Sequence, residues 1–215
     1  VDKMLILFLT MKLFLSVSAV VRNTSCPVVT TRELNWKDMD GTWYLSAVAT
    51  DLKLSGECAM VEFDHQDTLD VSIKWIANHT ASYYNGSVAL LPDPNSNTTG
   101  DLLQVTYNDQ KTETYSFLDI DYEHYAVALA CSNNSDGLSS TYEIWKMSRS
   151  IHLKAIDATK MDQAIAKYDL QGTPYKTFNN TDDTCRINIG SQFDTSVLVM
   201  MSAVAISFFR SSYTI

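Results

Sequence analysis

Cysteine is the residue type with the clearest chemistry in this chain of 215 residues. The four cysteines are widely spaced and form no Cys-x-x-Cys pair: Cys26, Cys58, Cys131 and Cys185. Structural zinc sites draw their ligands from closely spaced pairs, so this spacing does not favour a metal centre. In an oxidising compartment an even number of cysteines favours disulfides, and the spacing alone leaves three connectivities open.

Residues that could catalyse a reaction do not gather in the sequence. Nucleophilic catalysis needs a nucleophile beside a base, and metal catalysis needs a cluster of ligands. The chain has no Gly-x-Ser-x-Gly motif, and its histidines are scattered: His65, His79, His124 and His152. No histidine is indicated as an inward-facing haem ligand. We therefore predict a protein that is not an enzyme and that requires no metal or cofactor.

Six Asn-x-Ser/Thr sequons are the acceptor sites for N-glycosylation: Asn23, Asn78, Asn85, Asn97, Asn133 and Asn179. So many in one chain indicate a glycosylated, extracellular surface. The formal net charge of −9 does not favour nucleic acid or an anionic membrane surface as a partner.

The first residues have the layout of a secretory signal peptide. Residues 5–17 are almost wholly apolar, follow Lys3, and lead into the small residues Ser18 and Ala19. A short transmembrane anchor is the alternative, but the run is shorter than the roughly 20 residues that a span needs. We predict a signal peptide at 1–19 and one folded domain at 20–190.

The last residues, 191–215, form a hydrophobic C-terminal tail. Small residues two apart, Asn188 and Gly190, a short polar spacer and the apolar run 197–209 resemble a glycosylphosphatidylinositol (GPI) anchor signal, with Asn188 as the attachment site. Arg210 and the polar residues after it depart from such signals, which usually end apolar. A frayed peptide and a short membrane span are the alternatives.

The residues between these segments have a β pattern. Runs rich in Val, Ile, Thr, Tyr and Phe are separated by turn residues and recur about every dozen residues. The eight predicted strands cover 43–51, 59–65, 67–77, 82–92, 101–108, 113–121, 124–132 and 141–149. Asn85-Gly86 is either a hairpin turn or a bulge. Eight antiparallel strands in hairpin order can close into an up-and-down barrel, whose interior is filled or holds one small ligand.

One helix is predicted after the strands. Thr159 with Asp162 could form a cap, and Gly172 and Pro174 could end the helix. An apolar stripe follows at helical spacing: Met161, Ala164, Ile165 and Tyr168. The predicted fold is therefore mainly β, an eight-stranded antiparallel up-and-down barrel with one C-terminal helix packed outside.

Three segments of the chain resemble the lipocalin family. Gly41-Thr42-Trp43 looks like the Gly-x-Trp motif on its first strand, and Arg149 looks like its conserved arginine. Asp121-Tyr122 looks like its Thr-Asp-Tyr motif, with Ile120 in place of the threonine. The resemblance covers about residues 26–187.

Within that family the resemblance is closest to the apolipoprotein D branch, which includes insect bilin-binding and Lazarillo-type proteins. Cys26-Pro27, Cys131 after the segment at 121–126, and Trp145 four residues before the arginine carry this closeness.

The resemblance implies structural roles for several residues. It places Trp43 as a plug at the closed end of the barrel, with Arg149 over its indole in a cation–π contact of about 0.5–2 kcal/mol. At Gly41 the chain would enter the strand at a point where a Cβ could clash with that plug. The resemblance also implies the disulfide pairs Cys26–Cys131 and Cys58–Cys185.

Side-chain alternation identifies candidate ligand contacts. If Arg149 faces inward, then Met147, Trp145 and Glu143 do so too. The matching tryptophan in apolipoprotein D-like proteins lines the pocket, so Trp145 is the leading candidate. The other candidates are Leu45, Ala47, Trp75, Tyr83, Phe117, Tyr125 and Val127, each of which could equally be a core residue. The sequence leaves open which face of the strand holding Tyr125 and Val127 is inward.

These features lead to two compatible functional hypotheses. The first is an extracellular carrier of a small hydrophobic molecule such as a retinoid, fatty acid, sterol, carotenoid or bilin. The second is a GPI-anchored, glycosylated protein on the outer face of the plasma membrane that acts in adhesion or signalling, like Lazarillo-type proteins.

Overall fold

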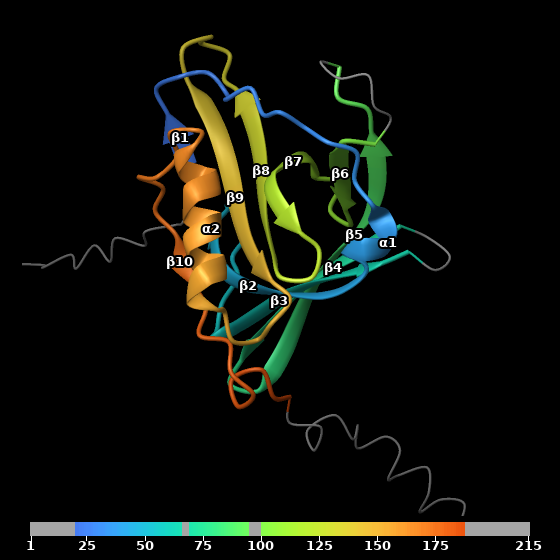
Figure 1. Cartoon of the computed structure of the whole chain (residues 1–215). Helices are drawn as coiled ribbons and strands as arrows, with labels where there is room; N and C mark the ends of the chain where they lie inside the picture. The colour runs from blue at the N-terminus through green and yellow to red at the C-terminus, as the bar shows by residue number, and fades with distance from the viewer. Residues whose placement is uncertain (1–19, 66–68, 95–99, 188–215) are drawn as a thin grey trace, which may run out of the picture.

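The computed structural model describes residues 20–65, 69–94 and 100–187. In these residues one antiparallel sheet has the strand order β1-β9-β8-β7-β6-β5-β4-β3-β2-β10, and β9 also pairs with β2. Strands β2 to β9 therefore form a closed ring of eight, as Figure 1 shows. The predicted eight-stranded antiparallel barrel with an outer C-terminal helix is confirmed. The predicted signal peptide, C-terminal tail, Asn97 and Asn188 lie outside the described residues.

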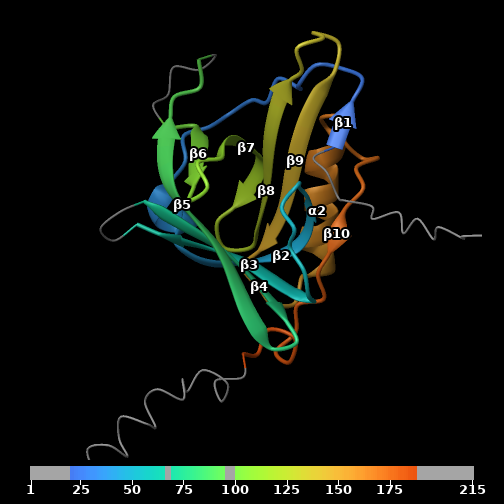
Figure 2. The same ribbon diagram turned by 180° about the vertical axis from the view of Figure 1, so that it is seen from behind.

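The strands of the ring are β2 (Gly41–Ala49), β3 (Cys58–Asp64), β4 (Asp70–Ala77), β5 (Thr80–Leu91), β6 (Leu102–Tyr107), β7 (Thr112–Asp121), β8 (Tyr125–Asn133) and β9 (Ser140–Ser148). The other elements are β1 (Val20–Arg22), α1 (Trp36–Met39), α2 (Ala155–Ala166) and β10 (Lys176–Thr177). Figure 1 has β8, β9 and α2 in front, and Figure 2 shows the opposite wall, with β2 to β5 forward.

The turn between β4 and β5 is a tight hairpin at Asn78 and His79, both with positive φ angles of 50° and 59°. Such left-handed pairs match the twist of the flanking strands. Asn85-Gly86 is not a turn, because it lies inside β5 and pairs with β4 and β6. A Cβ on Gly86 would lie 2.8 Å from the Thr106 carbonyl oxygen, so the close approach of β6 requires glycine here.

A register shift interrupts β2. Leu45 pairs with Met147, whereas Ala47 pairs with Lys146, so the shift lies between Leu45 and Ala47. An extra residue in one strand reverses the alternation of side chains beyond it. Leu45 and Val48 therefore belong to the interior cluster, and Ala47 does not. The assignment of Ala47 to the interior by simple alternation is wrong for this reason.

Helix α2 begins earlier than the sequence predicts. Lys154 occupies the N-cap without a side-chain hydrogen bond, so the predicted cap at Thr159 is wrong. The Thr159 hydroxyl instead donates to the Ala155 carbonyl oxygen, 2.9 Å away, inside the helix. The helix ends at Ala166, ahead of Gly172, and Asp169 then has a left-handed φ of 56°.

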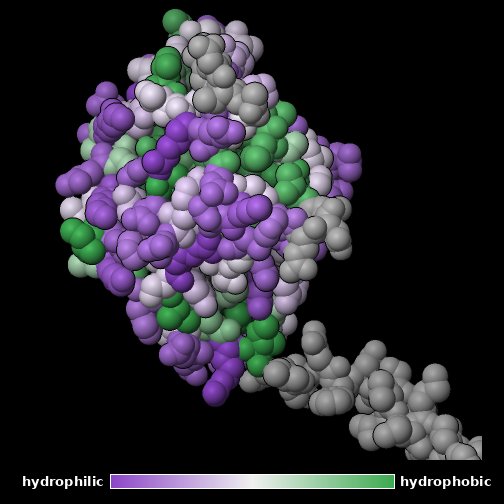
Figure 3. All heavy atoms as spheres, turned by 45° about the vertical axis from the view of Figure 1, so that its right-hand side comes forward, coloured by the Kyte–Doolittle hydropathy of each residue, from purple (hydrophilic) through white to green (hydrophobic). Residues whose placement is uncertain are grey.

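Hydrophobic residues form two clusters, one on each face of the barrel wall. The first fills the interior of the ring. The second lies between the outer face and α2, where Met161, Ala164 and Ile165 pack over β7 and β8. The predicted stripe is thus buried, except that Tyr168 lies beyond the helix and is half-buried. The face of the molecule in Figure 3 is mainly hydrophilic, with hydrophobic residues in a few small groups.

One end of the barrel is closed by Trp43 and Arg149. Trp43 is fully buried, and its indole N–H donates to the Met39 carbonyl oxygen of α1 at 2.8 Å. The guanidinium carbon of Arg149 lies 3.9 Å from the indole centroid, a cation–π contact. The guanidinium also donates to backbone carbonyls on three segments: Asp38, Asp40, Thr42 and Tyr122.

Gly41 is needed here for its backbone conformation. Its φ is +90°, which side chains rarely adopt. A Cβ would lie 3.6 Å from an Arg149 guanidinium nitrogen, an ordinary contact, so the clash expected from the sequence is not the reason.

Two disulfides attach the terminal segments to the ring. Cys26 and Cys131 join the N-terminal arm to β8, with their Cα atoms 5.8 Å apart. Cys58 and Cys185 join the C-terminal segment to β3, with their Cα atoms 5.2 Å apart. This is the pairing that the family resemblance implies.

Candidate functional site

A small apolar cavity lies inside the ring of strands. Its volume is about 30 Å³. Six strands contribute to the lining, and the aromatic members are Phe63, Tyr107, Tyr115, Phe117 and Trp145. A cavity of this volume holds roughly two water molecules.

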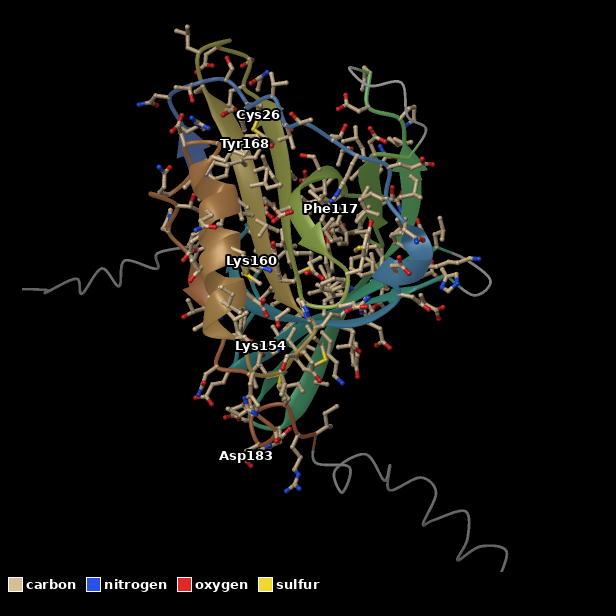
Figure 4. The ribbon with its side chains drawn as sticks, viewed as in Figure 1. Cys26, Phe117, Lys154, Lys160, Tyr168 and Asp183 are labelled. Carbon is tan, nitrogen blue, oxygen red and sulfur yellow. A yellow bond between two sulfur atoms is a disulfide. The ribbon has the colours of Figure 1, made fainter. Side chains whose placement is uncertain are left out.

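The structure brings three of the predicted contacts together at this cavity. Trp145 and Met147 of β9 and Phe117 of β7 line it. Leu45 is fully buried in the same interior cluster but does not line the cavity. Figure 4 shows Phe117 within the barrel, and Lys160 and Tyr168 on the side of α2.

Four other predicted contacts lie away from the cavity. Trp75 is half-buried against the interior cluster but does not reach the lining. Tyr83 is 55% exposed on β5. Tyr125 and Val127 belong to the outer cluster beneath α2, because Ala126 and Ala128 take the inward positions of β8. These four residues are not positioned to touch a ligand in the cavity. The same holds for Ala47, which lies beyond the register shift in β2.

Sequence reasoning missed most of the lining residues, which lie on β3, β4, β6, the start of β7 and β8: Val61, Phe63, Val71, Ile73, Leu103, Val105, Tyr107, Tyr115 and Ala128. Leu103, Val105 and Tyr107 alternate with outward polar residues along β6, and Tyr115 follows on β7. The period-2 pattern of β6 was visible in the sequence and could have identified its inward face.

Polar atoms in the cavity are few. The hydroxyls of Tyr107 and Tyr115 lie 3.2 Å apart and form a hydrogen bond. Burial raises the pKa of both phenols, so both are neutral at physiological pH. Trp145 is only 4% exposed, and its indole N–H has no hydrogen-bond partner among the described residues. An unpaired donor in an apolar interior is costly.

An acidic cluster lies next to the cavity, at the end of the barrel opposite Trp43. Glu143 precedes Trp145 by two residues on the same strand face, and its side chain is only 5% exposed. Its carboxylate accepts hydrogen bonds from the Thr50 hydroxyl at 2.8 Å and the Lys111 ammonium at 3.1 Å. Lys111 also contacts Asp51 at 2.6 Å and Glu113 at 3.2 Å. We call Asp51, Glu113 and Glu143 the acidic mouth cluster.

Burial and pairing act against each other in this cluster. Burial raises the pKa of Glu143, and the charge of Lys111 only partly opposes this effect. Asp51 is more exposed; burial is the largest single influence and raises its pKa, but the hydrogen bonds to Lys111 and Glu143 and the charge of Lys111 together lower it. Lys111 loses solvation too, yet its bonds to Asp51 and Glu143 raise its pKa.

In the described residues, no group of metal ligands and no membrane-spanning helix was found. No three His, Cys, Asp or Glu side chains in residues 20–65, 69–94 and 100–187 are arranged to hold a metal ion. Neither helix in the same ranges is long and apolar enough to cross a bilayer.

The sequons in the described residues are all on the surface. Asn23, Asn78, Asn85, Asn133 and Asn179 are exposed. Two of their side chains make local contacts: Asn85 accepts from the Ser72 hydroxyl and Asn133 from the Cys26 amide.

Comparison of the sequence with family models and with curated proteins gives no match. Solved structures do match. Insecticyanin from the tobacco hornworm Manduca sexta has a TM-score of 0.67 at 17% identity, over 80% of this chain and 94% of that one. Lobster apocrustacyanin A1 has a TM-score of 0.64 at 19% identity, over 77% and 93%. A biogenic amine-binding protein has a TM-score of 0.53 at 18% identity, over 76% and 91%. From the closed ring of eight strands to the outer helix, the chain has the lipocalin fold.

Proposed function

We propose that the protein is an extracellular carrier that holds a small, mostly apolar ligand in the barrel cavity. The observation that carries the proposal is Trp145, a buried residue on an apolar cavity whose N–H donor has no partner among the described residues. Enclosed, mostly apolar pockets with a few polar groups are typical of small-molecule sites. Two long-range disulfides fit an oxidising, extracellular compartment.

The cavity volume constrains how binding takes place. Ligand pockets usually measure about 300–1,000 Å³, far more than the present cavity of about 30 Å³. A retinoid, fatty acid, sterol or bilin therefore enters only if lining side chains move, and Tyr107, Tyr115 and Trp145 occupy the most space. The smaller the ligand, the smaller this rearrangement.

Quenching of tryptophan fluorescence tests the proposal. The full chain is expressed in insect cells and titrated with retinoic acid, arachidonic acid, a sterol and biliverdin. The chain has four tryptophans, so Trp145→Phe isolates the contribution from the cavity. We expect saturable quenching by at least one compound at micromolar concentration, and loss of most of it in Trp145→Phe.

Trp75→Phe is the matched control, because Trp75 packs against the same interior cluster without lining the cavity. This variant should keep the quenching. If the quenching is unchanged in Trp145→Phe, the carrier proposal stands, but the proposed binding site at Trp145 is wrong. If none of the compounds binds saturably, the carrier proposal itself is overturned.

A second candidate function is a GPI-anchored surface protein. The observation that favours it is the exposure of five sequon asparagines, which suits a densely glycosylated cell-surface domain. Phosphatidylinositol-specific phospholipase C should then release the protein from the surface of cells that express the full chain. An Asn188→Leu variant, with a bulky residue at the proposed attachment site, should stay off the surface. Secretion of wild type without enzyme treatment would contradict the anchor.

A further inference from the structure

We propose that Asn85 carries an N-linked glycan whose first two sugars lie in a polar groove on the outer face of the barrel, where the ring of Tyr83 stacks against the first N-acetylglucosamine. The site lies outside the barrel cavity and stands whether or not the cavity binds a ligand. Three features meet at this point: the orientation of the Asn85 amide, the groove beside it, and an exposed aromatic ring on the same strand face.

The amide of Asn85 is held in one orientation by the neighbouring strand. Asn85 lies in the middle of β5, and its side chain is exposed. The Ser72 hydroxyl of β4 donates to its Oδ1 at 2.7 Å. None of the described residues accepts a hydrogen bond from its Nδ2, the atom that N-glycosylation modifies. A sugar on Nδ2 therefore replaces no contact of the fold.

A polar groove lies beside Asn85 on the outer face of β3 to β6. Its volume is about 690 Å³, which is in the range of roughly 300–1,000 Å³ usual for small-molecule sites. Figure 2 shows β3, β4 and β5 on the wall that faces the viewer. Asn85 is part of the lining, together with carboxylates and hydroxyls from these strands and β6: Glu62, Asp64, Asp70, Ser72, Ser87 and Thr106. Sugar hydroxyls and N-acetyl amides can pair with such groups.

Tyr83 places an aromatic ring next to the attachment point. It precedes Asn85 by two residues, and β5 pairs with β4 without a register shift here, so both side chains lie on one face about 6–7 Å apart. Tyr83 is 55% exposed, and no other aromatic residue in the described ranges is as exposed. The Lys74 ammonium, 5.8 Å from the ring centroid, occupies at most one face of the ring. An aromatic ring is a large apolar surface for the C–H face of a sugar.

The aromatic ring distinguishes Asn85 from the other sequons. The residues two positions before the other five asparagines are Val21, Ile76, Asn95, Cys131 and Thr177, none of them aromatic. Asn78 also borders a groove, but there the residue two positions earlier is the buried Ile76. Covalent attachment at the rim of the groove gives the sugars a high effective concentration, so individually weak contacts are sufficient to hold them.

Cleavage by endoglycosidase H, followed site by site, tests the proposal. The full chain is expressed in human cells with the mannosidase inhibitor kifunensine, so that occupied sites carry high-mannose glycans. The enzyme cuts between the first two N-acetylglucosamines, which it reaches only when they leave the groove. Mass spectrometry of glycopeptides should show Asn85 occupied and cut in the native protein at least about fivefold more slowly than Asn133, which is exposed at the end of β8. In the denatured chain both sites should be cut at the same rate.

Variants of Tyr83 test the role of the ring. Tyr83→Ser keeps the sequon and removes the ring, so native cleavage at Asn85 should accelerate to within about twofold of that at Asn133. Tyr83→Phe keeps the ring and should keep the slow cleavage. Ile156→Ser is the matched control, because Ile156 is a similarly exposed apolar side chain on α2, 61% exposed. It should leave the rates at both sites unchanged.

Three outcomes would overturn the proposal. The first is an Asn85 that carries no glycan in the purified protein. The second is equal native rates of cleavage at Asn85 and Asn133, which would mean that the glycan extends into solvent. The third is slow cleavage that persists in Tyr83→Ser, which would mean that the strand around Asn85 hinders the enzyme and that the sugar does not stack on Tyr83.

Discussion

Arg149 is the residue on which the closed end of the barrel depends. Its guanidinium stacks on Trp43 and donates to carbonyls of α1, β2 and the β7–β8 turn. Hydrogen bonds from a charged donor contribute about 1.5–3 kcal/mol each and are not additive, and the cation–π contact adds about 0.5–2 kcal/mol. We expect Arg149→Met to lower the free energy of unfolding by about 2–4 kcal/mol, measured by urea denaturation with the disulfides intact.

Arg186→Met is the control for this prediction, because Arg186 is exposed near the end of the described residues. Its effect should stay within about 0.5 kcal/mol. A similar small loss for Arg149→Met would mean that solvent replaces the guanidinium contacts and that Arg149 does not hold the closed end together.

Residues in short motifs were predictable from the sequence, whereas residues brought together by the fold were not. Trp43 and Arg149 carry fixed roles in a recognisable pattern. Alternation from Arg149 also placed Trp145 and Met147 correctly inside the barrel, because β9 has no bulge between them. Lys111 could not be foreseen, because its carboxylate partners Asp51 and Glu143 lie 60 and 32 residues away along the chain.

Helix α2 stabilises the fold through its buried stripe rather than through its own propensity. Met161 is fully buried between the helix and the barrel wall. Truncation of a buried methionine leaves a cavity and typically costs about 2–5 kcal/mol. We expect Met161→Ala to lower the free energy of unfolding by that amount in urea denaturation.

Ile156→Ala is the matched control on the same helix, because Ile156 is 61% exposed. A surface substitution of this kind should change the free energy of unfolding by less than about 0.5 kcal/mol. Equal effects of the two variants would show that helix formation, and not packing on the barrel, determines the contribution of α2.

Elements with a strong local pattern were predictable, and elements held only by tertiary contacts were not. The eight strands of the ring were found within a few residues because their alternation and turn residues are local signals. Strand β10 has two residues and depends on its pairing with β2, so no local pattern marks it. The bulge in β2 follows from its pairing with β9, which is why alternation failed at Ala47.

At the scale of the whole molecule, both disulfides fasten segments that lie outside the ring of strands. The bridges close separations of 105 and 127 residues. The bridged segments also have contacts of their own: the Ser140 hydroxyl donates to the Thr24 carbonyl oxygen, and the Asn180 amide donates to the Leu45 carbonyl oxygen. The segments should therefore stay docked in the folded state when a bridge is absent, and the main effect should fall on the unfolded chain.

In the chain-entropy model, loss of a bridge over ~100 residues lowers the free energy of unfolding by about 4–5 kcal/mol as an upper value. We expect Cys58→Ala/Cys185→Ala to show that destabilisation in urea while its near-ultraviolet circular dichroism stays like that of wild type. Cys26→Ala/Cys131→Ala should behave alike, because the two loops have similar length. A changed spectrum, or limited proteolysis within residues 178–187 under native conditions, would instead show that the bridge holds the C-terminal segment on the folded barrel.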